Sequence, residues 1–137
     1  MSRGTGRTKR CGTEDAARRL EDARQFLEVA ERTTAPGYGD VVATNAIHAA
    51  IAAADVICCL RLGRRSNDGN HRVAVDLLRQ VDAQLANHLR RALDHKQQAA
   101  YESRDLSDRD AAACVEQARR LYRSAQEAVA GKRPRAT

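Results

Sequence analysis

The sequence predicts an all-α protein, an up-and-down bundle of four or five helices. Alanine occurs 26 times among the 137 residues, whereas proline occurs only twice. There is no tryptophan, and one phenylalanine and three tyrosines supply all the aromatic side chains. Alanine favours helix, and the scarcity of aromatic residues argues against a β-sandwich, a β-barrel or a stacking platform for single-stranded nucleic acid. The length corresponds to one domain.

The formal net charge of +6 is concentrated at the two ends of the chain. Residues 1–12 carry four basic side chains and no acidic one, and residues 131–137 carry three basic side chains. We expect both segments to be disordered basic arms around a nearly neutral domain at residues 13–130. Such arms either hold nucleic acid through its phosphates or remain solvated termini.

Two helices are predicted in the first half of the chain. The first begins at Thr13, whose hydroxyl can cap the exposed amides, and apolar residues recur with a period of 3.6 until a Pro-Gly pair ends it. The second runs over about residues 40–62, with Gly63 as its C-terminal stop. Two adjoining apolar stripes make this second segment the central helix of the bundle.

The second half of the chain begins with a loop, because residues 63–70 are rich in Gly, Asn, Ser and Arg. Apolar residues at helical spacing then continue to Tyr101, either as one long helix or as two helices joined near Asp82. Ser107 is followed three residues later by Asp110, a pattern typical of a helix start. The final helix is predicted to end at Gly131.

Cysteine usage and hydropathy predict a cytoplasmic protein. The four cysteines include no C-x-x-C motif, so we expect buried thiols in a reducing compartment rather than a zinc site or a disulfide framework. The first 25 residues contain no apolar core segment of a secretory signal. Residues 41–62 are interrupted by polar side chains and are not expected to span a membrane.

The strongest candidates for catalysis are Arg90 and His95, which are five positions apart on one predicted helix. Arg91 lies four positions before His95, and at either spacing an arginine can reach the imidazole. A histidine can exchange a proton with a 2′-hydroxyl or a leaving oxygen, and an arginine can stabilise charge on the phosphate. This pattern suits metal-independent RNA cleavage, and its alternative is a solvated helix face. His88 and His95 lie about 10.5 Å apart along the helix axis and cannot chelate one metal ion. We predict no metal site and no cofactor.

A polar cluster at the mouth of the bundle is the second candidate site. Asp55 interrupts the most apolar helix, and a buried charge needs a partner. Lys96 continues an apolar stripe and is therefore expected to face inward or to snorkel. The predicted cluster consists of Asp55, His71, Lys96 and Tyr101. The alternative is a structural polar contact, with Asp55 paired to one of His48, Arg61, Arg65, His71 and Lys96.

The third candidate site is a basic, glycine-containing loop before a helix. Arg64, Arg65 and Ser66 could bind phosphate there, because free amides and guanidinium groups favour anions. The G-x-x-x-x-G-K-[ST] pattern of a Walker loop is absent. A solvated basic loop is the alternative.

Several short segments occur together in this chain. They are A-A-D-V-I-C-C at residues 53–59, L-G-R-R-S at 62–66, N-H at 70–71 and K-Q-Q-A-A-Y at 96–101, followed by an alanine-rich last helix. In this combination the chain resembles actinobacterial HEPN-domain proteins over about residues 14–130. The positions that match the family pattern are Asp55, Gly63, Arg65, Ser66, His71, Lys96 and Tyr101.

The resemblance implies a small helical bundle that forms a homodimer and cleaves or binds RNA. Many HEPN proteins are toxins, and some are paired with a nucleotidyltransferase antitoxin. Active members carry an Arg, four to six residues, then a His, often followed by x-Tyr. Here Ala99 stands where that His would precede Tyr101, and Arg90 with His95 satisfies the spacing about one turn earlier. Two hypotheses follow: an endoribonuclease toxin that uses Arg90 and His95, or a non-catalytic homodimer that binds RNA or a protein.

Overall fold

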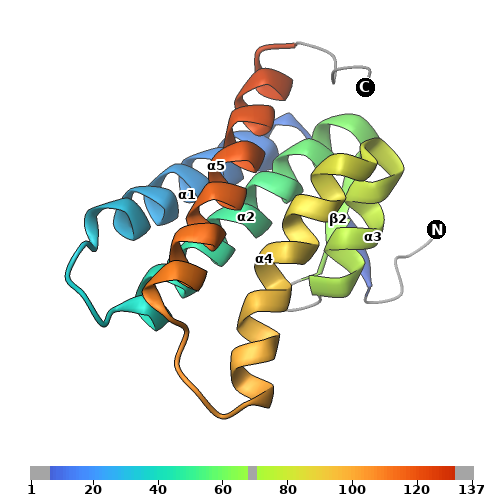
Figure 1. The fold of residues 1–137 in the computed structure, drawn as a ribbon. Helices are drawn as coiled ribbons and strands as arrows, with labels where there is room; N and C mark the ends of the chain where they lie inside the picture. The colour runs from blue at the N-terminus through green and yellow to red at the C-terminus, as the bar shows by residue number, and fades with distance from the viewer. Residues whose placement is uncertain (1–6, 68–70, 132–137) are drawn as a thin grey trace.

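The computed structural model describes residues 7–67 and 71–131. Within these residues the chain forms five helices and two short strands (Figure 1). In chain order they are β1 (Thr8–Arg10), α1 (Thr13–Arg32), α2 (Gly39–Leu62), β2 (Arg64–Ser66), α3 (His71–Val81), α4 (Ala83–Tyr101) and α5 (Asp108–Val129). The prediction of an all-α helical bundle is confirmed.

The central helix of the bundle is α2, as its two apolar stripes predict. It packs against α1 and α5 and also touches α3, α4 and β2. An unbroken run from Ala49 to Cys59 is buried, and the small alanine side chains let the neighbouring helices approach closely. By length and composition α2 could also cross a membrane, which corrects the expectation that it is too polar, but in this structure it forms the core.

Local capping signals account for most of the helix ends. Gly63 ends α2 in the left-handed conformation, and its N–H donates to the Cys59 carbonyl. Asp82 caps α4 by accepting from the Leu85 N–H at 3.0 Å, so the segment that ends at Tyr101 is two helices. The Ser107 cap of α5 is confirmed. Gly12, rather than Thr13, occupies the N-cap position of α1.

The N-terminal segment differs from the prediction of a disordered arm. Thr8–Arg10 pairs antiparallel with Arg64–Ser66, and Cys11 forms a disulfide with Cys59. The pairing of the two strands carries Cys11 to the last turn of α2, a proximity that no local pattern reveals. The expectations of a free arm over residues 7–12, and of four thiols, are therefore wrong. The rest of the predicted arm (1–6), the tail beyond Gly131 and residues 68–70 lie outside the described residues.

The other two cysteines, Cys58 and Cys114, are buried thiols, as predicted. Burial raises the pKa of Cys58 to about 12 and that of Cys114 to about 11, and nearby aspartates act in the same direction. Both side chains therefore remain protonated and behave as small core residues.

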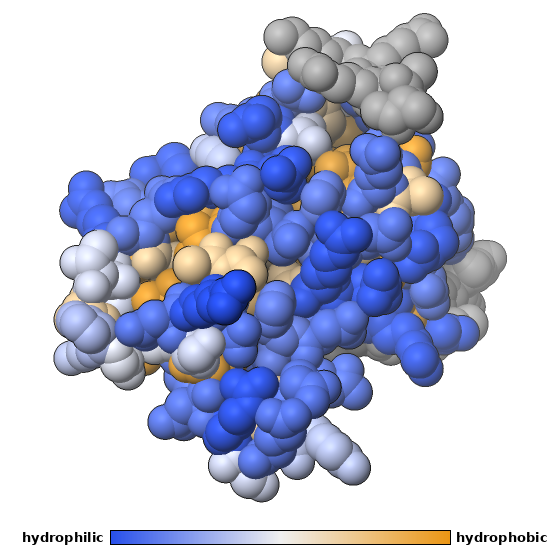
Figure 2. Space-filling view, viewed as in Figure 1, coloured by the Kyte–Doolittle hydropathy of each residue, from blue (hydrophilic) through white to orange (hydrophobic). Residues whose placement is uncertain are grey.

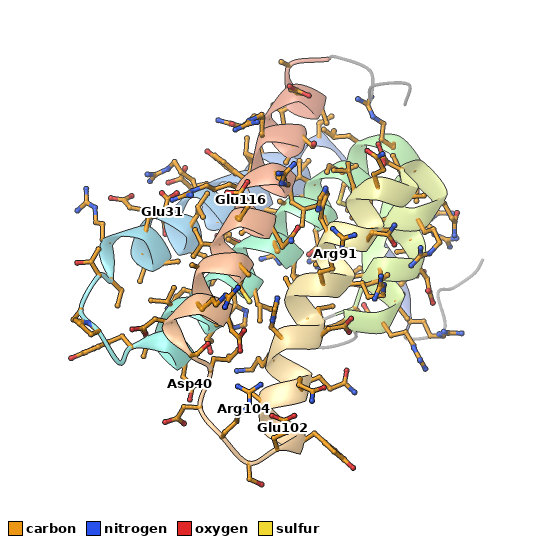
Figure 3. The ribbon with its side chains drawn as sticks, viewed as in Figure 1. Glu31, Asp40, Arg91, Glu102, Arg104 and Glu116 are labelled. Carbon is orange, nitrogen blue, oxygen red and sulfur yellow. A yellow bond between two sulfur atoms is a disulfide. The ribbon has the colours of Figure 1, made fainter. Side chains whose placement is uncertain are left out.

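Salt bridges and the loop between α4 and α5 make further contacts between the helices on the α5 side. Arg119 of α5 pairs with Glu31 of α1 at 2.6 Å and with Glu116 at 3.7 Å. Figure 3 labels the two glutamates, one on α1 and one on α5. The loop between α4 and α5 is held against the start of α2, where Asp40 accepts from the Leu106 N–H at 2.9 Å. The visible face in Figure 2 is mostly hydrophilic, with a small apolar area over the junction of α1 and α5.

Candidate functional site

A concave site lies between α2, α3 and α4, and we call it the α2–α3–α4 pocket. Its volume is about 600 Å³, within the range of small-molecule sites. All three helices contribute polar and apolar side chains to its walls. The lining residues are Thr44, Ile47 and His48 from α2, His71, Arg72, Val75, Asp76 and Arg79 from α3, and Arg90, Leu93, Asp94, Lys96, Gln97 and Ala100 from α4.

The walls of the pocket combine apolar patches with an excess of positive charge. Four cationic side chains and two carboxylates line it, in addition to two imidazoles. Arg90 is partly neutralised by Asp94 at 3.0 Å. Within residues 7–67 and 71–131, neither Arg72 nor Arg79 is held in an ion pair. These two guanidinium groups are therefore available to an anionic ligand.

Helical spacing explains how each helix presents its side chains to the pocket. Thr44 and His48 are one turn apart on α2, and Arg72, Asp76 and Arg79 follow one face of α3. Lys96 of α4 bridges to α2 by donating to the Thr44 hydroxyl at 3.1 Å. Its side chain is exposed in the pocket, so of the two predicted arrangements, facing inward or snorkelling, the inward one is wrong.

His48 is the imidazole that α2 contributes to the pocket. Its ring stacks on Phe26 of α1, with 5.1 Å between the ring centroids. Desolvation lowers the pKa of His48, and the nearby charges of His71, Lys96 and Arg19 lower it further. His48 is therefore neutral at pH 7 and can accept a proton or a hydrogen bond.

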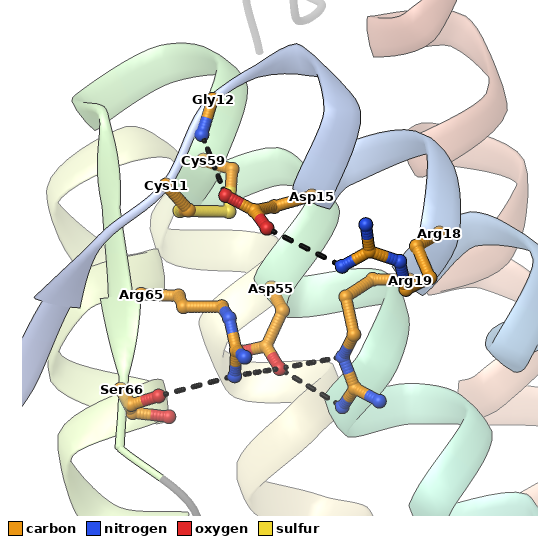
Figure 4. Close-up of a disulfide and its surroundings, with 9 residues drawn as sticks. All are labelled: Cys11, Gly12, Asp15, Arg18, Arg19, Asp55, Cys59, Arg65 and Ser66. Atoms are coloured by element: carbon orange, nitrogen blue, oxygen red, sulfur yellow. Dashed lines mark hydrogen bonds and ion pairs between the residues drawn. A yellow bond between two sulfur atoms is a disulfide. The ribbon is translucent and has the colours of Figure 1, made fainter.

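Asp55 lies elsewhere, buried between α1, α2 and β2 (Figure 4). Its Oδ2 accepts two hydrogen bonds from Arg19, at 2.9 and 3.1 Å, and lies 3.4 Å from Nη1 of Arg65. The need for a partner was predicted correctly, and Arg65 was among the candidates, but Arg19 was missed. Asp55 therefore belongs to a structural ion cluster.

The structure brings together two of the remaining members of the predicted polar cluster and separates the third. His71 and Lys96 line the pocket, whereas the Tyr101 side chain projects into solvent with 88% of its surface exposed. Residues 64–66 form β2 instead of a free loop, because they pair with β1. Ser66 is buried and Arg64 is exposed.

The predicted catalytic pair, Arg90 and His95, does not converge within one chain. Five residues correspond to about 140° around a helix, so the two side chains leave α4 in different directions. Arg90 lines the pocket and pairs with Asp94, whereas His95 turns toward Asp110 of α5, with 3.7 Å between Nδ1 and Oδ1. The other histidine of this segment, His88, contacts Gln117 of α5 at 2.6 Å.

The pocket was not predicted from the sequence, although the spacing of two arginines indicates part of it. Arg72 and Arg79 are seven residues apart, which places both on the same side of α3. That spacing predicts a basic helix face. It does not indicate that this face meets His48 of α2 and Gln97 of α4.

Metal-ligand geometry is absent from the part of the chain that the structure describes, where no three His, Cys, Asp or Glu side chains gather closely enough to hold an ion. Comparison with family models, curated proteins and solved structures finds no match.

Proposed function

We propose that this protein is a HEPN-like bundle that binds RNA in the α2–α3–α4 pocket. The observation that carries the proposal is the group of cationic side chains around apolar walls, where Arg72 and Arg79 form no ion pair with any other described residue. Arginine and lysine neutralise phosphates, and apolar side chains can receive the face of an unpaired base or a sugar. Leu93, which is partly exposed, supplies such a surface, and Ile47 and Val75 form the more deeply buried part of the wall.

The same pocket offers a route to cleavage that differs from the Arg90–His95 pair. His48 is neutral at pH 7 and could take the proton of a 2′-hydroxyl, while His71 lines the same cavity. Binding without turnover remains the alternative. Homodimerisation, a nucleotidyltransferase antitoxin, a toxin–antitoxin role and a cytoplasmic location stay predictions.

Binding is tested with a fluorescent single-stranded RNA and a pair of matched double variants. Arg72→Ala/Arg79→Ala removes two cations of the pocket, whereas Arg120→Ala/Arg123→Ala removes two cations from exposed positions on α5. Because two charge-assisted phosphate contacts are lost, we expect Kd to rise at least tenfold for the first variant. The second should change Kd less than threefold at the same salt concentration.

Equal weakening by both double variants would show that binding depends on overall charge and not on the pocket. Cleavage is measured on the same RNA with EDTA present, for wild type and for His48→Gln, His71→Gln and His95→Gln. Loss of cleavage in the first two variants would place the chemistry in the pocket. Loss of cleavage in His95→Gln alone would support the Arg90–His95 pair that the sequence predicts. If wild type does not cleave the RNA, the alternative of binding without turnover holds.

A further inference from the structure

The disulfide ties the N-terminal strand to the far end of the central helix (Figure 4). Cys11 directly follows β1, and Cys59, 48 positions later, lies in the last turn of α2. The other backbone contacts of this segment are a three-residue ladder with β2 and two flanking hydrogen bonds. One runs from the Cys11 N–H to the Gly63 carbonyl at 3.1 Å, and the other from the Asn67 N–H to the Arg7 carbonyl at 3.0 Å.

The side chains of β1 contribute little burial. Thr8 is half-buried, and Lys9 and Arg10 are exposed. Of residues 7–12, Cys11 is the one that packs against the hydrophobic core. A two-stranded ribbon is at best marginally stable unless it buries apolar surface. The covalent bond is therefore the principal contact that holds this strand in place.

We propose that the Cys11–Cys59 disulfide is a redox latch that keeps β1 on the bundle and releases it when a thiol reductant opens the bond. Cys11 is the more exposed partner, so a thiolate of a dithiol attacks its sulfur. The S–S bond breaks, and Cys59 leaves as a thiolate that takes up a proton. The second thiol of the reductant then displaces Cys11 as a thiol and closes the oxidised, cyclic reductant.

The latch has two defined states. In the oxidised protein, residues 8–10 are a strand. In the reduced protein, residues 7–11 detach while Gly12 stays as the N-cap of α1, and Arg7, Lys9 and Arg10 become part of the flexible basic arm that the composition predicts. The helices persist in both states, because α1 and α2 bury their own apolar faces against each other and against α5. This inference does not depend on the proposed RNA site.

Limited tryptic digestion tests the latch, because three trypsin sites lie in the strand segment. The full chain is digested with and without dithiothreitol, and cleavage after Arg7, Lys9 and Arg10 is timed by mass spectrometry. Cleavage after Arg32, at the exposed end of α1, is the internal reference. Proteases need a locally unfolded segment, so reduction should accelerate cleavage in the strand at least tenfold and leave the reference rate unchanged.

Two variants make the test specific to this bond. Cys11→Ser should be cleaved rapidly without reductant, and Cys114→Ser should respond to the reductant as wild type does. The latch is refuted if strand cleavage is insensitive to reductant, or if cleavage after Arg32 accelerates equally, which would mean that the bond stabilises the whole fold. It is also refuted if the protein purified without reductant lacks the mass deficit of two hydrogens.

Discussion

Asp55 illustrates the free-energy cost of burying a charged side chain. The residue is 3% exposed in the middle of an apolar helix, where an isolated carboxylate would be strongly disfavoured. Arg19 supplies two hydrogen bonds from α1, and Arg65 approaches from β2. One charged residue thereby fixes three elements relative to one another.

Replacement of Asp55 by asparagine should therefore destabilise the fold without creating a cavity. The variant retains the shape of the side chain but removes the buried negative charge that Arg19 and Arg65 share, while Arg19 keeps its ion pair with Asp22. Because both arginines are partly exposed and can reach water, we expect the free energy of unfolding to fall by about 2 to 4 kcal/mol, toward the lower part of the range for broken buried pairs. Urea unfolding followed by circular dichroism measures this loss.

Asp94→Asn is the matched control, because Asp94 forms an exposed salt bridge with Arg90. Pairs of this kind contribute less than about 1 kcal/mol. Similar losses in Asp55→Asn and Asp94→Asn would show that the Asp55 cluster contributes no more than a surface ion pair.

Among the elements, α2 and the loop before α5 approach each other closely. Gly39 begins α2 and is buried against the backbone of this loop. A Cβ at this position would overlap the Leu106 carbonyl oxygen. The adjacent hydrogen bond from Leu106 to Asp40 lowers the pKa of that carboxyl group and fixes the same contact from the other side. A glycine is thus required here for close approach.

Gly39→Ala should separate α2 from the loop, since backbone atoms cannot move aside as a flexible side chain can. We expect a loss of about 1 to 3 kcal/mol in unfolding free energy, the typical cost of overpacking. Gly12→Ala is the control, because a Cβ at Gly12 would meet nothing within 4 Å. If the melting temperatures of the two variants fall equally, the loop does not constrain the start of α2.

At the scale of the whole molecule, the pKa of His48 depends on side chains from three other helices. Its environment comes from Phe26 of α1, His71 of α3 and Lys96 of α4, around its own position on α2. The pKa of His48 is lowered from 6.5 because the folded protein disfavours its charged form. Folding therefore links the proton uptake of one residue to the packing of the bundle.

The pH dependence of stability should reveal this link. Above pH 6.5, His48 is neutral in both the folded and the unfolded chain and adds no pH dependence. As the pH falls below 6.5, the unfolded chain takes up the proton first, so His48 lowers the free energy of unfolding until the folded form is protonated too.

Wild type should therefore lose more stability between pH 7 and pH 5.5 than His48→Gln loses. The stability of both proteins is measured as the denaturant concentration at the midpoint of unfolding across this pH range. The other histidines contribute to both curves, so the difference between the curves reports His48. Parallel curves for the two proteins would mean that the environment of His48 in the folded state does not disfavour its charged form.

The sequence by itself determined the helical class, the central position of α2 and most helix ends. Those features depend on interactions within a few residues: a 3.6-residue apolar period, the Ser107 cap and the left-handed Gly63. The residues that take part in these interactions are close together in the chain, so a single sequence reveals them.

Tertiary structure alone decided the disulfide, the partners of Asp55 and the composition of the pocket. Arg19 and Asp55 are 36 positions apart, and Cys11 and Cys59 are 48 apart. The spacing of Arg72 and Arg79 places both on one face of α3, but the element facing it depends on how α3 and α4 dock on α2. Docking is set by the summed packing of many small side chains, and no local pattern specifies which faces meet.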